Sequence, residues 1–297
     1  MMGAEPIWRQ AAAKRLNVLA AASLVALWCG QMGRYHYFLE LFAHFLPHYA
    51  LILLVAACAG RGKTRLLWLV SATACAVWLL RPPPARAPVS ANGWTLLWYN
   101  VHFENADPAA ESVRILAERA DIAAFAELDE NRPAWSRVRQ AYPHGCGHRE
   151  AGPFALVLWS RQPLAACETF FVDAVPYVRA VREDGTAVYA LHPPPPVNAY
   201  LAGVRRDYLR AAAEKIARET DVVVVGDLNS SPFSPVFRDF AAHARITAQT
   251  PAYLPTWQPF GLNIDHVLSR EPAQSVRALA WRHSDHRPLV ARFSAVK

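Results

Sequence analysis

The C-terminal two thirds of this 297-residue sequence lack an excess of either charge. Nine of the 31 Lys and Arg residues and two of the 24 acidic residues lie in residues 1–90, which leaves 22 of each sign in residues 91–297. The net charge of +7 therefore belongs to the N-terminal part. Non-specific binding of nucleic acid needs a basic face that follows the phosphates. The charge balance argues against such a face, although it is compatible with a local basic patch.

Cysteine is also scarce, with five in the chain. Cys29, Cys58 and Cys75 lie in apolar stretches, where cysteine is most simply a small hydrophobic residue. Cys146 and Cys167 lie further along, where a disulfide would be chemically permitted in an oxidising compartment. Two cysteines do not establish a disulfide framework, so the sequence leaves this pairing open.

Long apolar stretches are confined to the first 90 residues, roughly at 16–30, 39–60 and 66–80. The middle one is long enough to span a bilayer, whereas the other two are short against the usual 20 or so residues. Apolar helices of this length also occur in soluble cores. Here, however, the charges are confined to the connections and leave the helices no polar face. We therefore expect a membrane anchor of about three transmembrane helices over residues 1–90.

A cleaved signal peptide is the alternative for the first stretch. No small-x-small cleavage site follows it, and the bulky Trp28 before Cys29 argues against lipoprotein processing. Basic residues concentrate before the first stretch and between the second and the third. With three spans, the positive-inside rule places the N-terminus in the cytoplasm and residues 91–297 outside a bacterial-type inner membrane. The proline-rich run 81–88 is typical of a stiff linker.

From Trp94 onward, strand-like and helix-like segments interleave without strict alternation. This order predicts an α/β (α+β) sandwich of mixed sheets rather than a parallel doubly wound fold. We expect strands at 94–101, 122–128, 154–159, 178–182, 186–191, 222–225, 265–269, 275–281 and 289–293, and helices at 107–120, 133–142, 200–219 and 236–243.

Polar side chains stand where several of these hydrophobic runs stop. The run 222–225 consists of four valines, typical of a strand buried on both faces, and is followed by Gly226, where we expect the backbone to turn. Because alternate side chains of a strand share a face, Asp227 and Asn229 are expected to point into one pocket. The pairs Asp265-His266 and 285–286 repeat this arrangement of acid and imidazole. Hard oxygen ligands beside a base are what a divalent-metal phosphoester hydrolase needs.

Six short motifs, each at a predicted strand end, carry a resemblance to a known family. They are Trp98-Tyr99-Asn100-Val101, Ala126-Glu127-Leu128, Leu191-His192-Pro193, Gly226-Asp227-Leu228-Asn229, Ile264-Asp265-His266 and Ser284-Asp285-His286-Arg287-Pro288. With them, residues 91–297 resemble the endonuclease/exonuclease/phosphatase superfamily of DNase-type nucleases, abasic-site endonucleases, sphingomyelinases and inositol polyphosphate 5-phosphatases. The resemblance implies a catalytic domain over these residues, built as a four-layer sandwich of two mixed β-sheets flanked by helices.

The resemblance also implies a metal site. Glu127 becomes the principal metal carboxylate, with Asn100 and Asp285 as direct or water-mediated ligands. Mg²⁺, or Mn²⁺, is the expected ion, because Mg²⁺ is usually held by one or two carboxylates and several waters.

The remaining motif residues acquire catalytic roles by the same resemblance. Asp227 and Asn229 would orient and activate the attacking water. His286, held in its tautomer by Asp265, would carry the proton or stabilise the phosphorane, since imidazole titrates near neutrality. His192 would bind the phosphate or assist the leaving group.

One departure from the family pattern concerns the first motif. In abasic-site endonucleases an acid stands two positions after the first Asn, and His102 occupies that place here. Asn105 is expected to complete the local polar set, so that it binds substrate together with His192 and Asn229. His266 alternates to the opposite strand face and is expected to be structural. A zinc site is the alternative chemistry, although the spacings match no zinc pattern; its candidates are His102, His192, His266, His283 and His286.

We therefore expect an integral-membrane, divalent-metal-dependent phosphoester hydrolase. The neutral domain and its membrane tether favour a lipid head group or a small phosphodiester as substrate, and a nuclease acting on DNA or RNA is the alternative. A catalytically silent, membrane-tethered binding domain is the alternative of another class, although such a domain has no need of all six motifs. The sequence indicates the membrane and the phosphoester as partners and points to no protein partner.

Overall fold

The computed structural model describes residues 7–88 and 92–295. The chain forms two units, one of residues up to Arg81 with Phe233–Val236, the other of Pro82–Pro232 with the residues from Phe237 onward. Each unit is described by itself.

The N-terminal unit is helical. It consists of α1 (Ile7–Gln31), α2 (Tyr37–Leu41), the 3-10 turn η1 (Phe42–Phe45), α3 (Leu46–Ala59) and α4 (Gly62–Leu79). Small side chains such as Ala20, Ala56 and Ala72 pack the helices together. Many large apolar side chains face outward, among them Val18, Trp28, Leu51, Leu54, Leu66, Leu67, Val70 and Val77. Helices that are apolar all round are typical of buried or membrane-embedded helices.

Two segments of the described residues, Gln10–Gln31 and Tyr37–Ala59, are long and apolar enough to cross a membrane. The expected third span does not meet the same criterion, so the number of possible spans is two rather than three. The reason lies in α4, which has 18 residues and carries Lys63 and Arg65 in its first turn. These charges shorten the apolar part of the helix below the usual length of a span.

The second unit contains two six-stranded sheets. Sheet A has the order β11 (Ser275–Ala278), β12 (Leu289–Phe293), β1 (Trp94–Asn100), β2 (Ile122–Ala126), β4 (Leu156–Ser160), β3 (His144–His148). Sheet B has the order β5 (Leu164–Val172), β6 (Val175–Arg182), β7 (Ala187–Leu191), β8 (Val222–Asp227), β10 (Asp265–Ser269), β9 (Thr247–Ala248). The pairs β1–β2 and β7–β8 are parallel and the others antiparallel, so both sheets are mixed, as predicted.

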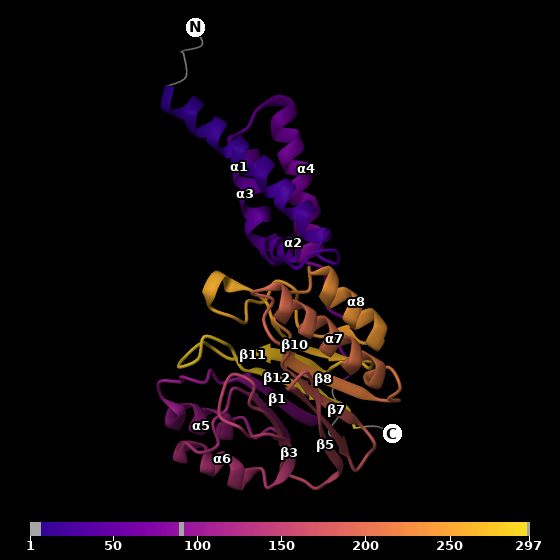
Figure 1. The fold of residues 1–297 in the computed structure, drawn as a ribbon. Coiled ribbons are helices and arrows are strands. Elements are labelled where there is room, and N and C mark those ends of the chain that lie inside the picture. The colour runs from indigo at the N-terminus through magenta and orange to yellow at the C-terminus, as the bar shows by residue number, and fades with distance from the viewer. Residues whose placement is uncertain (1–6, 89–91, 296–297) are drawn as a thin grey trace. The chain divides into compact units, whose positions relative to one another are not determined.

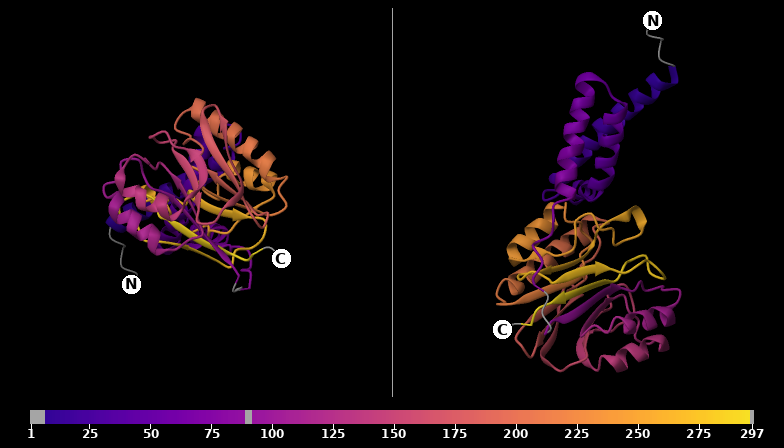
Figure 2. Two further views of the ribbon diagram at one scale, coloured as in Figure 1. Left: turned by 90° about the horizontal axis from the view of Figure 1, so that it is seen from below. Right: turned by 180° about the vertical axis from the view of Figure 1, so that it is seen from behind.

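Helices cover the outer faces of the two sheets, which gives the predicted sandwich. The helices α5 (Pro108–Ala117) and α6 (Ser136–Ala141), with the 3-10 turn η2 (Pro133–Trp135), lie along sheet A, and α7 (Ala199–Ile216) and α8 (Pro235–Ala244) along sheet B (Figures 1 and 2). Alternation along the strands divides the apolar residues between two cores. Leu96 and Val225 belong to the core between the sheets, whereas Leu97 and Trp159 belong to the core under α5 and α6.

Cys146 and Cys167 form a disulfide that joins β3 of sheet A to β5 of sheet B. The sequence had left this pairing open. Both residues pack against the core between the sheets. The bond therefore fastens the two sheets together across their interface.

Several strand ends meet at one edge of the sandwich, which we call the Asp227 edge. In sheet A, Asn100 at the end of β1 lies beside Ala126 at the end of β2. In sheet B, β8 ends at Asp227, which is paired with Asp265 at the start of β10. The parallel and antiparallel pairings thus bring the motif-bearing ends of four strands to the same edge.

Gly226 does not provide the turn that we expected after the valine run. It lies inside β8, beside Leu191 of β7. A Cβ at this position would lie 2.2 Å from the backbone oxygen of Leu191. Glycine is therefore needed here for the close approach of two strands, and β8 continues through it to Asp227.

Candidate active site

Three polar side chains extend the inward-facing rows of the strands to the Asp227 edge. Asn100 follows Trp98 on β1, and Asp227 follows Val225 on β8, each two residues further along the same face. Asp265 stands opposite Asp227 in the register. All three polar residues are at most 2% exposed, so they lie where the apolar core ends and water is largely excluded.

The Oδ2 atom of Asp227 is the centre of this group. It accepts a hydrogen bond of 3.2 Å from Nδ2 of Asn100, which also donates to Oε1 of Glu127 at 2.9 Å. Nε2 of His286 lies 3.6 Å and Nε2 of His192 lies 3.8 Å from the same Oδ2 atom. Five of the residues singled out from the sequence therefore surround one point.

Asp265 holds His286 from the side away from Asp227. Its Oδ2 atom lies 2.8 Å from Nδ1 of His286, and its Oδ1 atom accepts a hydrogen bond of 2.9 Å from the indole of Trp98. An ionised carboxylate only accepts hydrogen bonds, so His286 must donate through Nδ1. This contact leaves Nε2 directed toward Asp227, as the sequence-based pairing required.

The site gives its titratable groups unusual protonation. Burial disfavours the charged form of His286, but the carboxylates of Asp265 and Asp227 outweigh it and raise the pKa of His286 to about 10. Burial and then the charge of Asp265 raise the pKa of Asp227 to about 7. Burial lowers the pKa of His192, an effect that Glu127 opposes. One histidine is thus cationic and the other neutral at pH 7, and the carboxyl between them titrates near neutrality.

Two of the predicted site residues have a left-handed backbone, which non-glycine residues adopt at a cost of about 1 kcal/mol or more. They are Glu127, with φ of 58°, and Asn229, with φ of 47°. The carboxylate of Glu127 accepts a hydrogen bond from the backbone N–H of Phe103 at 3.1 Å. The backbone N–H of Asn229 donates to Asp227 at 2.9 Å, and its Nδ2 donates to the carbonyl of Pro193 at 3.0 Å. Glu127 thus contacts the group through its side chain, and Asn229 contacts it through its backbone N–H.

Asp285 reaches the site from the loop before β12. Its Oδ2 atom accepts a hydrogen bond of 2.7 Å from the indole of Trp257. Its Oδ1 atom is buried without a hydrogen-bond partner and lies 3.9 Å from Nε2 of His286. The hydroxyl of Ser284 donates to the carbonyl of Asn100 at 2.9 Å and fastens this loop to the end of β1.

Two residues named in the sequence analysis lie outside the group: Asn105, which was expected to bind substrate, and His266, which was expected to be structural. The Nδ2 atom of Asn105 donates to the carbonyl of Val101 at 2.6 Å, and its Oδ1 atom accepts from the N–H of Asp107 at 3.0 Å. Asn105 therefore shapes its own loop, and the geometry does not bring it to the phosphate site. His266 faces the other side of β10, where Nε2 lies 2.8 Å from the carbonyl of Ser230, in agreement with a structural role.

The donor set suits a hard divalent cation. Among the described residues, Asp227, Asp265 and His286 form a group whose ligand atoms lie within 4.8 Å of one another and that could hold a metal ion. Burial is the main cause of the raised pKa of Asp227 and the negative charge of Asp265 adds to it, while the buried Oδ1 atom of Asp285 has no hydrogen-bond partner. A bound divalent ion would offset this negative charge and act as a Lewis acid on the phosphoryl oxygen. The histidines of the alternative zinc site do not assemble in the described part of the chain.

Sequence reasoning missed the residues that support the site from behind. The hydroxyl of Tyr208 accepts a hydrogen bond of 3.0 Å from the N–H of His192 and donates to Pro176. Arg205 is fully buried, and its Nη1 atom donates to the carbonyl of Asn229 at 2.8 Å. A signal for Arg205 was present, because it occupies a helical spacing shared with apolar residues of α7, namely Ala202, Leu209, Ala212 and Ile216.

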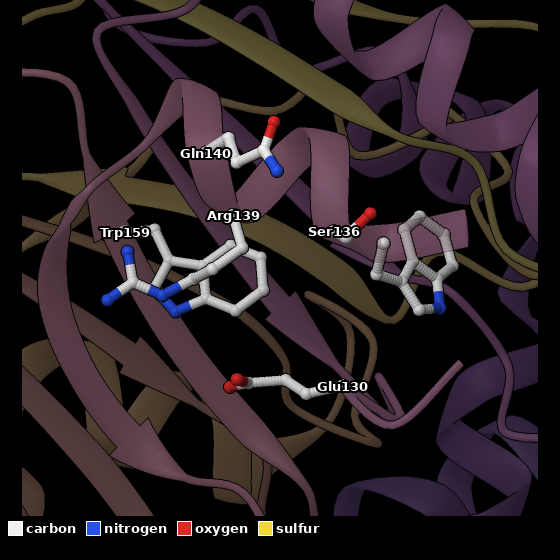
Figure 3. Close-up of a pocket in the computed structure, with 6 residues that line it drawn as sticks. Glu130, Ser136, Arg139, Gln140 and Trp159 are labelled. Carbon is white, nitrogen blue, oxygen red and sulfur yellow. The ribbon is translucent and has the colours of Figure 1, made fainter. Parts of the chain in front are cut away.

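A separate pocket lies on the other face of sheet A. It has a volume of about 310 Å³ and is lined by Glu130, Trp135, Ser136, Arg139, Gln140 and Trp159 (Figure 3). The guanidinium of Arg139 lies 5.6 Å from the centroid of the Trp159 ring. Because Trp159 belongs to the core under α5 and α6, this pocket is not part of the Asp227 group.

Several solved structures share the fold. They include an endonuclease/exonuclease/phosphatase from Beutenbergia cavernae (TM-score 0.56, 19% identity, 68% of this chain and 71% of that chain). A 3′ phosphatase from Neisseria bound to a product DNA hairpin matches with a TM-score of 0.55 and 16% identity, over 68% of this chain and 99% of that chain. Sphingomyelinase C from Streptomyces griseocarneus matches with a TM-score of 0.50 and 14% identity, over 68% of this chain and 99% of that chain. No curated protein matches the sequence.

These likenesses show the fold alone, because the identities are low. The sequence itself carries the assignment further, since residues 97–286 match the Endonuclease/Exonuclease/phosphatase family over more than half of the chain. The chain therefore belongs to the Endonuclease/Exonuclease/phosphatase family and is a metal-dependent phosphoester hydrolase.

Proposed function

We propose that the protein is an integral-membrane hydrolase that uses Mg²⁺ or Mn²⁺ to cleave the phosphoester of a lipid head group or another small phosphodiester outside the cytoplasmic membrane. The observation that carries the chemistry is the convergence on Oδ2 of Asp227. There an amide, a cationic imidazole and a neutral imidazole meet a carboxyl group whose pKa is about 7. These are the groups required to orient water, accept its proton and neutralise a phosphate.

The metal in this proposal is held mainly by Glu127 and Asp285. Both oxygens of Asp265 are already engaged by Trp98 and His286, so binding a metal there would break those contacts. Asn100 presents its Nδ2 atom to the carboxylates, while its Oδ1 atom accepts from the N–H of His102 at 3.1 Å. A water-mediated role therefore suits Asn100 better than direct ligation.

Asp227 and Asn229 orient the attacking water, and Asp227 takes its proton as the water oxygen bonds to phosphorus. The positive charge of His286 stabilises the phosphorane, and its Nε2–H is placed to protonate the departing ester oxygen. His192, neutral at pH 7, donates from Nε2 to a phosphate oxygen. Asn229 is the second group placed beside the phosphate, with its amide near Pro193 and His192.

A small or lipidic substrate is favoured over nucleic acid by charge. Residues 91–297 carry 22 basic and 22 acidic residues, so the domain has no excess of cations to neutralise a polyphosphate backbone. The fold is shared with proteins named for DNA and for sphingomyelin alike, and it does not decide between these substrates.

The outer location is supported by the disulfide between Cys146 and Cys167, because such bonds persist in oxidising compartments. If only the two apolar segments cross, the basic flanks put both ends of the anchor in the cytoplasm. With two spans, an outer domain requires both ends of the anchor to lie outside, and the disulfide is the observation that favours this orientation over the one that the basic flanks predict.

The test uses the full chain in detergent with bis(4-nitrophenyl) phosphate as a generic diester. We expect turnover that needs Mg²⁺ or Mn²⁺, and undiminished turnover in EDTA would contradict the metal assignment. Glu127→Gln keeps the shape of the side chain and removes its charge, so the rate should fall by orders of magnitude. Glu183→Gln, in an exposed turn, is the control and should leave the rate unchanged. A loss of less than about tenfold in Glu127→Gln would exclude it as principal ligand.

The substrate class is tested with the same protein on a panel of phospholipids, small phosphodiesters, phosphomonoesters, DNA and RNA. We expect the highest kcat/KM on a lipid or a small diester. Preferential cleavage of DNA or RNA would replace the proposed substrate by the nuclease alternative. Absence of turnover on every substrate with either metal would favour the silent binding domain.

A further inference from the structure

The exposed large apolar side chains of residues 92–295 gather at the Asp227 edge. All but one of them lie on loops, at a strand end or in the first turn of α7 at this edge, and together we call them the apolar rim: Phe103, Phe171, Val197, Tyr200, Tyr253 and Phe260. The pairings place these segments there, because Phe103 follows β1, Val197 and Tyr200 follow β7, Tyr253 and Phe260 precede β10, and Phe171 lies at the β5–β6 turn. The exception is Val113 on α5. An apolar patch collected around a site marks an interaction surface.

Two long segments of the rim contain no charged residue, the loop before α7 with the first turns of that helix and the stretch before β10. Residues 192–204 and residues 250–264 lack Asp, Glu, Lys and Arg. Nearby arginines are engaged in shaping the protein: Arg132 donates to the carbonyl of Asn105, and Arg287 donates to the carbonyls of Leu279 and Pro255. These two segments of the rim therefore offer apolar contact and no cation to a nucleic-acid backbone.

The loop that carries Phe260 is fastened to the catalytic residues. The indole of Trp257 donates to Asp285, and its ring centroid lies 6.4 Å from that of His286. The N–H of Gln258 donates to the carbonyl of Asp285 at 2.7 Å. Phe260 follows with φ of 60° and an exposed fraction of 66%. A strained backbone thus presents a phenyl ring to the outside, directly beside the catalytic group.

The linker from the anchor enters the catalytic unit next to this loop. Arg86 donates to the carbonyl of Gln249 at 3.1 Å, and the N–H of Ala87 donates to the carbonyl of Ala273 at 3.1 Å. Helix α4 ends with Leu80 as its C-cap. The free part of the linker is therefore short and spans at most about 20 Å. Gln249 immediately precedes the uncharged loop 250–264, so the chain that leads from the anchor is attached next to that loop.

We propose that the apolar rim docks into the surface of the bilayer that carries the anchor, so that the catalytic group takes its phosphoester from a membrane lipid. This inference rests on the proposed function and narrows its substrate to a lipid at the membrane surface. Aromatic side chains suit this contact because their rings are stable at the boundary between head groups and hydrocarbon. In this proposal the anchor keeps the catalytic unit close to the bilayer, and the apolar rim orients the catalytic group toward the lipid.

The experiment places a reporter on the rim of the full chain in lipid nanodiscs. Cys29, Cys58 and Cys75 are replaced by Ala, which keeps the disulfide, and Phe260→Cys is labelled with the fluorophore NBD. The nanodiscs contain phosphatidylcholine and phosphatidylglycerol, with or without doxyl-labelled phosphatidylcholine. Val113→Cys, labelled in the same way, is the matched control, because Val113 is exposed but lies away from the rim.

At position 260 we expect a blue-shifted emission and quenching of at least about twofold by the doxyl lipid, since the label would enter the interfacial region. At position 113 we expect neither. Equal, unquenched emission at both positions would overturn the docking. A response at position 260 to single-stranded DNA, with none to the doxyl lipid, would also overturn it and assign the rim to nucleic-acid stacking.

The same labelled proteins are assayed on bis(4-nitrophenyl) phosphate with Mg²⁺, which separates this inference from the function on which it rests. Quenching at position 260 without hydrolysis would leave the docking in place and contradict the proposed catalysis. Hydrolysis without quenching would leave the catalysis in place and overturn the docking.

Discussion

At the scale of single residues, Asp265 sets the tautomer and the protonation of His286. Its two oxygens are bound by one imidazole and one indole, and it is fully buried. A carboxylate in this position both fixes the tautomer of the histidine and favours its protonated form. The charge of His286 at neutral pH is therefore a property of the pair rather than of the histidine alone.

The first prediction concerns this pair. His286→Ala should reduce kcat/KM by about 10²–10⁴-fold, the usual worth of a positioned general acid or base. Asp265→Asn should cost less, and adding it to His286→Ala should do little further harm, because residues that act as a unit give non-additive losses. A double-mutant cycle on the full chain measures this, with folding checked by circular dichroism. Fully multiplicative losses in well-folded variants would show that the two residues act separately.

The pH dependence gives a second prediction for the same pair. If the cationic form of His286 is required, activity falls as the pH rises through its pKa, which the carboxylates raise to about 10. Asp265→Asn removes a neighbouring negative charge and lowers this pKa, so the alkaline limb of the pH–rate profile should move to lower pH. Asp207→Asn on the exposed face of α7 is the control and should leave the limb in place. An unmoved limb in Asp265→Asn would mean that another group titrates there.

At the scale of elements, the close approach of β7 and β8 positions Asp227. A methyl group at position 226 would meet the backbone of Leu191, which no side-chain rotation can relieve. Gly226→Ala should therefore destabilise the protein by about 1–3 kcal/mol, as overpacking does, and displace Asp227 enough to reduce turnover.

The control for Gly226→Ala is another glycine of the same unit. Gly203 lies in α7, and a Cβ added there would have nothing within 4 Å, so Gly203→Ala should stabilise the helix by about 0.5–1 kcal/mol. Urea unfolding and diester hydrolysis of the two variants provide the comparison. Equal stability of Gly226→Ala and the native chain would show that the strands can move apart without cost.

The contact of α7 with sheet B supplies a test of stability against pH. Glu219, just beyond α7, accepts hydrogen bonds from Arg179 at 2.7 Å and from Tyr189 at 2.8 Å. Burial raises the pKa of Glu219, but the bonds from Arg179 and Tyr189 outweigh this and lower it below the ordinary value of 4.5. The stabilisation is therefore present above pH 4.5 and is lost as the pH falls through the lowered pKa.

Glu219→Gln should accordingly be less stable than the native chain at pH 7, and the difference should shrink below pH 4.5. Urea unfolding at a series of pH values measures it. Asp207→Asn removes an exposed ion pair with Arg210 and should change stability little at any pH. A difference for Glu219→Gln that persists unchanged at pH 3 would contradict the ionic origin of the effect.

At the scale of the whole molecule, the disulfide and the membrane topology are linked. The bond between Cys146 and Cys167 closes a loop with a sequence separation of 21, which corresponds to about 3 kcal/mol in the chain-entropy account. Replacing both residues by Ser should lower the stability of the catalytic unit by that order. Equal stability of the double variant and the oxidised native chain would show that the disulfide does not stabilise the catalytic unit.

The location is tested with fusions after Lys297. A reporter that works only in the periplasm should be active when it is fused after Lys297. A reporter that works only in the cytoplasm should be silent in the same position. The opposite result would place the catalytic unit in the cytoplasm, where the basic flanks of a two-span anchor would put it. In that case the thiols of Cys146 and Cys167 would be reduced in the cell.

The predictable part of the fold consists of strands whose ends are marked by polar motifs. The bounds 265–269 and 289–293 agree with β10 and β12 because each run stops at a charged or turn-forming neighbour. The strands β3 and β5 were missed, as was the two-residue strand β9. β3 contains Gly145 and Gly147, both with positive φ, and β5 is only partly buried, so neither shows a clear hydrophobic pattern.

The candidate site also has a part that the sequence predicts and a part that it does not. The resemblance carried by the six motifs predicted that Asn100, Glu127, His192, Asp227 and His286 belong to one site, and the structure brings them to one edge. The left-handed backbone at Glu127 and the contact of Trp98 with Asp265 depend on packing between sheets that no local pattern encodes. The roles assigned to the site residues remain predictions until the variants are measured.

The order of strands in sheet A has a consequence for the folding of the newly synthesised chain. β12, almost the last segment of the chain, lies between β11 and β1, and His286 immediately precedes it. A nascent chain therefore carries Asn100, Glu127 and Asp227 long before it can complete the catalytic group. Hydrolysis must therefore wait until β12 has been synthesised and has inserted beside β1. The order of the strands thus keeps the chain inert while the segments that carry the earlier motifs are being made.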